Sequence, residues 1–115
     1  MKVLANNKRF FKEEETQWEV VAEGVQRQIL GFDDRVMMVN VKFEKGAIGP
    51  LHNHHHTQVT HIVVGTFGVT IEEETRILKK GDSFYIPSNK IHGVVCLEEG
   101  ILIDVFSPMR EDFIK

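Results

Sequence analysis

Histidine is crowded into one short part of this 115-residue chain, where five of the six histidines fall between positions 52 and 61. His52 and His54 are two residues apart, a spacing that on a β-strand points both imidazoles to the same side. Gln58 keeps that parity, and His92 follows a proline-containing turn later in the chain. Three imidazoles and one amide oxygen can surround a divalent transition metal and leave one or two coordination positions open. We therefore predict a metal site at His52, His54, Gln58 and His92, with its open positions available for ligand capture or chemistry.

The histidine-rich segment also allows other interpretations. A tract such as HNHHH can be a solvated loop that binds metal adventitiously. His55 and His61 have the opposite parity, which favours a place at the surface, at an interface or in a hydrogen bond. His56 has the parity of the predicted ligands and competes with Gln58 for the same corner, so it stays an alternative ligand.

Period-two apolar patterns predict the elements that must position these side chains. In VMMVNVKF (36–43) alternate apolar residues share one face, as in a strand and unlike a helix: Met37, Val39, Val41 and Phe43. The histidine-rich segment passes from a loop into a strand that runs through VTHIVV (59–64). Gly65 and the segment 98–100 are expected to separate strands, and the acidic run 72–74 is expected at a hairpin tip. The later strands are expected at 66–71, 75–78, 83–86, 91–96 and 101–106.

Seven or eight short strands at intervals of about ten residues, without alternating helices, predict an all-β fold, and we expect a small jelly-roll β-barrel. The length leaves room for one domain, residues 1–115, whose 42% hydrophobic residues form a core without disulfides. Helix is expected only at the ends: one or two turns in KEEETQWE (12–19), and a short helix in the tail 107–115 with Ser107 as N-cap and Pro108 as its first residue.

Charge and hydropathy exclude several classes of partner. A net charge of −3 with mixed signs is not the basic surface that binds nucleic acid. No apolar run approaches the roughly 20 residues of a membrane-spanning helix, and the start of the chain has no signal-peptide core. We expect a soluble, cytoplasmic protein with no nucleic-acid or membrane partner.

Two stretches of the chain carry the motifs of a known family. Residues 46–65 fit the first cupin motif, G-x5-H-x-H-x3-E-x6-G, and residues 81–96 fit the second, G-x5-P-x-G-x2-H-x3-N, without a gap. The chain thus resembles the cupins, which implies a β-barrel that holds a metal through His52, His54, Gln58 and His92.

Three positions depart from the cupin motifs. Asn89 replaces the second glycine of the second motif, Cys96 replaces its final Asn, and Gln58 stands where the family usually has Glu. An amide in place of a carboxylate leaves the charge of the ion uncompensated, which favours an anionic ligand over the dioxygen chemistry of some cupins. The metal stays open among nickel, zinc, iron and manganese.

Over nearly its full length the chain is similar to one branch of cupins, the KdgF-type pectin-degradation proteins. The similar segments are the opening stretch around Gly24, Arg27 and Leu30, then VKFEKGAIGPLHNHHHTQ (41–58), KKGDSFYIPSNKIHGVVCLEEG (79–100) and LIDVFSPMREDF (102–113). This resemblance implies metal-dependent linearisation of 4,5-unsaturated monouronates, the products of pectin or alginate lyases, to open-chain keto sugars.

An acidic residue interrupts an apolar strand face near the C-terminus, in a place that suits this reaction. Leu102, Asp104 and Phe106 share one face, so Asp104 would share the cavity with the metal if that face points inward. We expect Asp104 to be the general acid and base, Arg110 to hold the uronate carboxylate and Phe106 to pack on the sugar ring. Alternatively, Asp104 and Arg110 form only an ion pair that fastens the tail.

Other functions are compatible with the same residues. One is a non-catalytic, metal-dependent sugar-binding or sensor cupin, and another is a cupin isomerase or dioxygenase acting on a different small acid. Because a single small barrel has strand edges to cover, we also expect a homodimer.

Overall fold

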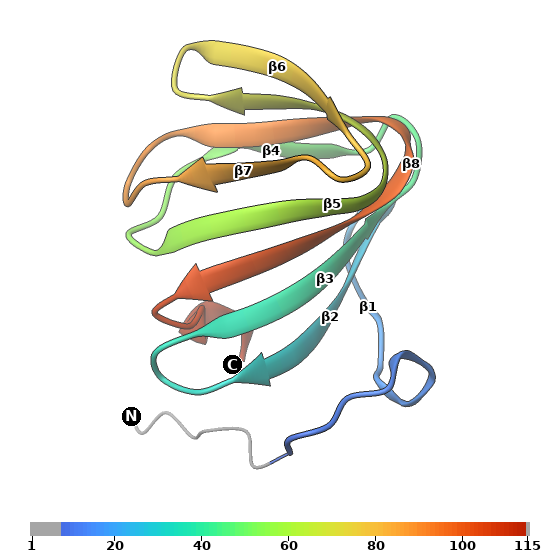
Figure 1. Cartoon of the computed structure of the whole chain (residues 1–115), viewed down its shortest axis with the longest axis vertical. Coiled ribbons are helices and arrows are strands. Elements are labelled where there is room, and N and C mark those ends of the chain that lie inside the picture. Colours follow the sequence, from blue (N-terminus) through green and yellow to red (C-terminus); the bar gives the residue numbers. More distant parts are fainter. Residues whose placement is uncertain (1–7, 115) are drawn as a thin grey trace.

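The computed structural model describes residues 8–114 and is built almost entirely of β-strands (Figure 1). This confirms the predicted all-β fold. In the described part of the chain, no helix is long and apolar enough to cross a membrane. The elements in chain order are η1 (Glu13–Glu15), β1 (Glu19–Ala22), β2 (Val25–Phe32), β3 (Met37–Phe43), β4 (Ile48–His52), β5 (Thr57–Ile71), β6 (Glu74–Lys79), β7 (Ser83–Ile86), β8 (His92–Ser107) and η2 (Glu111–Phe113).

Two long strands, β5 and β8, bend sharply, so that one sheet folds into two layers (Figure 1). The first half of β5 pairs with the second half of β8, and these halves form one layer with β1, β2, β3 and β7. The other halves of β5 and β8 pair with each other and with β6 and β4 to form the second layer. Since β1 and β6 end the sheet, the structure is a jelly roll with free edges and not a closed ring of strands.

Gly65 and Gly100 let the bends of β5 and β8 touch. Gly65 has a φ of +95°, and a Cβ at this position would lie 2.5 Å from the Cα of Gly100 and 2.6 Å from the carbonyl oxygen of Glu99. A Cβ at Gly100 would likewise meet the carbonyl oxygen of Val64. The predicted strand breaks at Gly65 and at 98–100 are therefore wrong, because glycine lets both strands turn the corner without ending.

The period-two patterns correctly identify the residues that face the space between the layers. Met37 and Val39 of β3 are buried, as are Leu102 and Phe106 of β8, and Asp104 lines a cavity on the same face of β8. Phe43 and Phe67, from opposite layers, meet edge to face in the core. The same core cluster includes Cys96. The apolar core thus continues directly into the face that carries Asp104.

The hairpin of β1 and β2 was not among the predicted strands. In β2, Arg27 faces the space between the layers, whereas Gln28 faces outward. Gln28 is nevertheless fully buried, because the preceding segment crosses over it and accepts its amide hydrogens at the carbonyl oxygens of Glu13 (3.1 Å) and Thr16 (2.8 Å). Of the predicted helical stretch 12–19, only the single turn η1 forms.

The C-terminal tail differs from the helix predicted for 107–115. Ser107 is not a helix N-cap, because it is the last residue of β8 and pairs with Thr57 of β5. Pro108 therefore does not begin a helix, and the helical turn in the described part of the tail is η2. Met109 is buried against β3 and β8, and this contact turns the tail back over the sheet so that η2 lies beside the cavity between the layers.

Candidate metal centre and adjoining pocket

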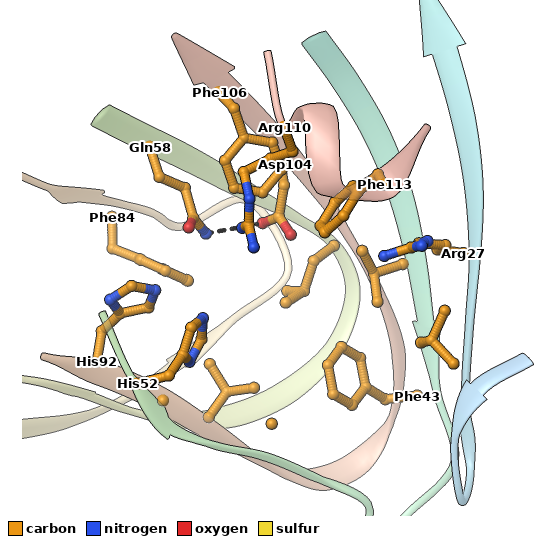
Figure 2. Close-up of a pocket in the computed structure, with 16 residues that line it drawn as sticks. Arg27, Phe43, His52, Gln58, Phe84, His92, Asp104, Phe106, Arg110 and Phe113 are labelled. Atoms are coloured by element: carbon orange, nitrogen blue, oxygen red, sulfur yellow. Dashed lines mark hydrogen bonds between the residues drawn. The ribbon is translucent and has the colours of Figure 1, made fainter. Parts of the chain in front are cut away.

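A cavity of about 240 Å³ lies between the two layers. Figure 2 shows His52 and His92 at one end, Arg27 at the other, and Asp104 and Arg110 between them. The volume is smaller than the roughly 300–1,000 Å³ typical of pockets for drug-sized ligands. The cavity therefore suits a small molecule, and the imidazole, carboxyl and guanidinium groups that line it offer polar partners.

Three of the four predicted ligands meet beside this cavity, and two of them, His52 and His92, line it. The ring centroid of His92 is 4.4 Å from that of His52 and 4.8 Å from that of His54, and one nitrogen of each ring lies within 4.8 Å of the other two. His52 ends β4 and pairs with His92 at the start of β8, whereas His54 lies in the loop after β4. The premise that His52 and His54 share one strand is thus wrong. They converge because the chain turns at the end of β4.

The backbone selects which nitrogen of each imidazole carries the hydrogen. Nδ1 of His52 lies 2.8 Å from the carbonyl oxygen of Pro50, and Nδ1 of His54 lies 3.0 Å from that of His56. Nδ1 of His92 lies 2.9 Å from the carbonyl oxygen of Lys90. A carbonyl oxygen can only accept, so each Nδ1 must donate. In the neutral rings the Nε2 lone pairs are then available to a metal, an orientation typical of metal-binding histidines.

Burial favours the neutral form of two of these rings. It lowers the pKa of His92 to about 4, and it also lowers the pKa of His54, where the charge of Arg110 adds to the effect. Nε2 of His92 is buried and has no hydrogen-bond partner in the described structure. A neutral imidazole with an unpartnered buried lone pair is the state that a metal requires.

Gln58 completes a donor set that suits a cation. Its Nε2 donates to Thr60 Oγ1 (2.9 Å) and Asp104 Oδ1 (3.2 Å), so its Oε1 points the other way, 3.1 Å from Nε2 of His54. Because Nδ1 of the neutral His54 ring carries the hydrogen, Nε2 of His54 is an acceptor and faces a second acceptor, Oε1 of Gln58. A cation between these two atoms removes their repulsion. The residues present therefore fit a divalent metal, with three nitrogens and one oxygen as ligands.

The other histidines lie elsewhere. His55 and His61 are exposed at the surface. His56 is buried and its ring lies 3.9 Å from that of His55, but it does not belong to the group of three. The geometry thus supports Gln58, and not His56, as the fourth donor.

Asp104 lies in the cavity beside the metal-binding group. Its Oδ1 accepts hydrogen bonds from Thr60 Oγ1 (2.6 Å) and from Gln58 Nε2 (3.2 Å), whereas Oδ2 has no hydrogen bond within the described residues. Burial raises the pKa of Asp104 to about 6, although the hydrogen bonds and the charge of Arg110 oppose the rise. A carboxyl with such a pKa can give and take a proton near neutral pH.

Arg110 does not form the ion pair with Asp104 that was the alternative explanation for both residues. Its Nε and one terminal nitrogen instead bind the carboxylate of Asp112, at 3.1 and 2.9 Å. The other terminal nitrogen has no hydrogen bond in the part of the chain that the structure describes. The guanidinium lies 5.1 Å from the ring centroid of Phe106, which is buried and lines the cavity.

Two further residues of the pocket had no predicted role in the site, although both lie in segments that resemble the KdgF-type proteins. Arg27 lies with its guanidinium carbon 3.8 Å from the ring centroid of Phe113, and Arg110 lies 4.4 Å from the same centroid. Figure 2 shows the ring of Phe113 between the two guanidinium groups. Nε of Arg27 donates to Glu19 at 2.6 Å. The resemblance included Arg27 and Phe113 but assigned a role to neither, and the strand that carries Arg27 was not predicted.

The fold and the donor set together define the class of protein. Residues 39–106 match the model of the cupin domain. The chain therefore belongs to the cupin family.

Individual relatives narrow this class. The chain is 50% identical over 109 residues to the pectin degradation protein KdgF of Dickeya dadantii (strain 3937), which covers 93% of this chain and 99% of that protein. The structure of KdgF from Halomonas sp. matches with a TM-score of 0.89 at 41% identity, covering 93% of this chain and 99% of that one. The structure of an RmlC-like cupin from Shewanella frigidimarina NCIMB 400 matches with a TM-score of 0.93 at 44% identity, covering 96% of this chain and 99% of that one. Within the cupins, this chain is thus similar to KdgF proteins.

Proposed function

We propose that this cupin is an enzyme that linearises 4,5-unsaturated monouronates, the products of pectin or alginate lyases, to open-chain keto sugars. The observation that carries the proposal is the position of Asp104, whose carboxyl lies in a small cavity between a three-histidine group and two arginines. The 50% identity to a pectin degradation protein supports the same class of substrate.

The reaction removes one proton from an oxygen and adds one to a carbon. Loss of the C1 hydroxyl proton forms the aldehyde as the bond between C1 and the ring oxygen breaks, which leaves an enolate at C5. Proton addition at C4 then converts the enolate to a ketone, so substrate and product are isomers. Asp104 accepts the first proton and donates the second, and positioned proton transfer of this kind is worth roughly 10²- to 10⁴-fold in rate.

The remaining pocket residues bind and orient the substrate. A divalent metal held by His52, His54, His92 and Gln58 would supply Lewis-acid polarisation of the substrate oxygens. One terminal nitrogen of Arg110 has no hydrogen bond among the described residues and can donate to the uronate carboxylate, and the neutral ligand set makes an anionic substrate favourable. Phe106 offers an apolar surface to the sugar ring.

The size of the cavity restricts the substrate to one sugar. Arg27 and Phe113, which contact each other, form the wall opposite the histidines. A second sugar unit on that side would have to displace this pair. We therefore expect an unsaturated disaccharide to be a poor substrate.

The proposed function is tested with the metal-loaded and the metal-depleted protein on the unsaturated monouronate from a pectin lyase digest. The loaded protein should accelerate the loss of the ultraviolet absorbance of the conjugated double bond, with the open-chain keto sugar appearing by NMR. The unsaturated disaccharide serves as the size control. A decay rate equal to that without protein would remove the proposal, and tight binding of the sugar without turnover would favour a sensor.

A further inference from the structure

Thr60 is a residue to which neither the motifs nor the proposed reaction assigns a role. It is 2% exposed, lies two residues after Gln58 on β5, and stands directly opposite Asp104 of β8 in the antiparallel register. Alternate residues of a strand point to the same side, and opposed residues of paired strands are nearest neighbours. The sheet therefore places the Thr60 side chain against both Gln58 and Asp104.

The three side chains form a closed triangle of hydrogen bonds. The hydroxyl of Thr60 donates to Oδ1 of Asp104 at 2.6 Å and accepts from Nε2 of Gln58 at 2.9 Å. Nε2 of Gln58 also donates to Oδ1 of Asp104 at 3.2 Å. A hydroxyl has one hydrogen, and it is used on Asp104, so its lone pair must face the amide hydrogen of Gln58.

This triangle determines the orientation of the two groups that the proposed reaction uses. The amide nitrogen of Gln58 donates toward Thr60 and Asp104, so the carbonyl oxygen faces His54 at 3.1 Å. Oδ1 of Asp104 accepts two hydrogen bonds, so Oδ2 is the oxygen left for the substrate.

We propose that Thr60 is a positioning residue that aims the carbonyl oxygen of Gln58 at the histidine group and presents Oδ2 of Asp104 to the substrate. Its kinetic consequence rests on the proposed function, whereas its effect on Gln58 can be measured without any substrate. Thr60 itself touches no reacting atom.

Two variants separate the hydroxyl from the packing. Thr60→Val keeps the shape and removes the hydroxyl, and Thr60→Ser keeps the hydroxyl and removes the methyl group. Thr66→Val is the matched control, because Thr66 also lies on β5 but binds the exposed Glu98 outside the pocket. If Thr60→Val does not fold in a thermal melt, Thr60→Ala takes its place.

Co²⁺ is the probe that needs no substrate. Apo protein of each variant is titrated with Co²⁺ while its visible d–d spectrum is recorded. We expect Thr60→Val to bind Co²⁺ roughly 10- to 100-fold more weakly and with an altered spectrum, as for loss of other groups that orient a ligand. Thr60→Ser and Thr66→Val should match the wild type.

Turnover of the unsaturated monouronate at saturating metal is the second readout. We expect kcat of Thr60→Val to fall by about 10²-fold with little change in KM, because a misplaced carboxyl slows the proton transfer and not the binding. Thr60→Ser should restore kcat to within about threefold of the wild type, since it restores the hydrogen bond.

The outcomes are distinct. An unchanged Co²⁺ spectrum and kcat in Thr60→Val overturn the proposal, as does a Thr60→Ser variant impaired as much as Thr60→Val, which would assign the effect to the methyl group. A wild type without turnover would instead refute the proposed function, and the Co²⁺ comparison would still decide the role of Thr60.

Discussion

At the scale of single residues, Gln58 connects the metal-binding group to the carboxyl of Asp104. Its carbonyl oxygen faces His54 at 3.1 Å, and its amide nitrogen donates to Asp104 at 3.2 Å. A glutamate at this position has no hydrogen to donate, so it could ligate the metal but would turn a second carboxylate toward Asp104. The amide is therefore suited to a site in which a metal and a proton-transferring acid lie side by side.

We predict that Gln58→Glu binds Zn²⁺ more tightly than the wild type but turns over more slowly. The added negative charge strengthens the ligand set, while two facing carboxylates raise the pKa of the pair and hold a proton between them. We expect at least about tenfold lower kcat. Zn²⁺ affinity by competition with a chelating dye and steady-state kinetics measure the two effects. A kcat equal to that of the wild type would show that the bond between Gln58 and Asp104 does not matter for turnover.

Asp104 and His92 should separate proton transfer from metal binding. We predict that Asp104→Asn loses turnover by a factor of roughly 10² to 10⁴ while its metal content stays intact. His92→Ala should lose both, because it removes one of three clustered imidazoles. Metal content by elemental analysis and the absorbance assay distinguish these cases. An active Asp104→Asn enzyme would return that residue to a structural role.

At the scale of elements, the bends of β5 and β8 bring the site together. β8 carries His92 at its start in one layer and Asp104 near its end in the other, so the two lie on one strand but reach the cavity from opposite layers. β5 contributes Gln58 beside Asp104. Without the bend, these side chains would be separated along the length of a flat sheet.

We predict that Gly65→Ala destabilises the fold by roughly 3 kcal/mol or more, because it adds steric overlap to an unfavourable φ. The new Cβ would meet Gly100 at 2.5 Å. Gly46→Ala is the matched control, since Gly46 has a φ of +87° but no atom within 4 Å of the added Cβ. Gly46→Ala should lower the free energy of unfolding by only about 1–2 kcal/mol. Urea unfolding measures the free energy of unfolding of both variants. Equal losses would show that the close approach of Gly65 to Gly100 does not restrict the residue at position 65.

The tail element η2 holds the two guanidinium groups through Phe113. Each cation–π contact is worth roughly 0.5–1 kcal/mol at such sites. Phe113→Ala loses two of them, so we predict a roughly 5- to 30-fold rise in KM for the unsaturated monouronate. The thermal melting temperature should fall by several degrees, because Phe113 also packs against Phe106 and the core, whereas Ile114→Ala, at an exposed neighbour, should leave KM unaltered. An unchanged KM in Phe113→Ala would mean that Arg27 and Arg110 hold their positions without the ring.

At the scale of the whole molecule, the outer surface of the first layer carries an apolar row. Met38, Val105, Val59 and Tyr85 stand side by side across β3, β8, β5 and β7. Three of these side chains are exposed, by 42% in Met38, 47% in Val59 and 58% in Tyr85. An exposed apolar row on a sheet is typical of a surface that another protein covers.

We predict that the protein is a homodimer that pairs through this row, which lies on the reverse side of the layer that carries Asp104. Sedimentation velocity should give twice the mass of one chain. Val59→Asp should shift the mass to that of a monomer, because a charge would be buried in the interface. Ile77→Asp, at an exposed position of β6 outside the row, should remain dimeric. A monomeric wild type would contradict the prediction.

Local patterns predicted the fold class and several of the side chains that the structure brings together at the cavity. Alternation along the chain placed Asp104 and Phe106 on one inward face, and the motif spacing selected His52, His54, Gln58 and His92. The structure confirms the inward face of Asp104 and Phe106, because side-chain direction in a strand depends on the backbone alone, whereas the roles of the site residues stay predictions. The same reasoning failed for His54, which lies in a loop, and at Gly65, where a glycine was interpreted as a break and is a bend.

The sequence by itself thus determined the strand faces, the fold class and the set of side chains available for chemistry. The tertiary structure alone decided how they meet: the triangle that Thr60 forms with Gln58 and Asp104, and the contact of Arg27 and Arg110 with Phe113. The physical reason is that these contacts join residues brought together by strand pairing and by the returning tail. Periodicity along one segment carries no information about which distant segment becomes its neighbour, or in which register.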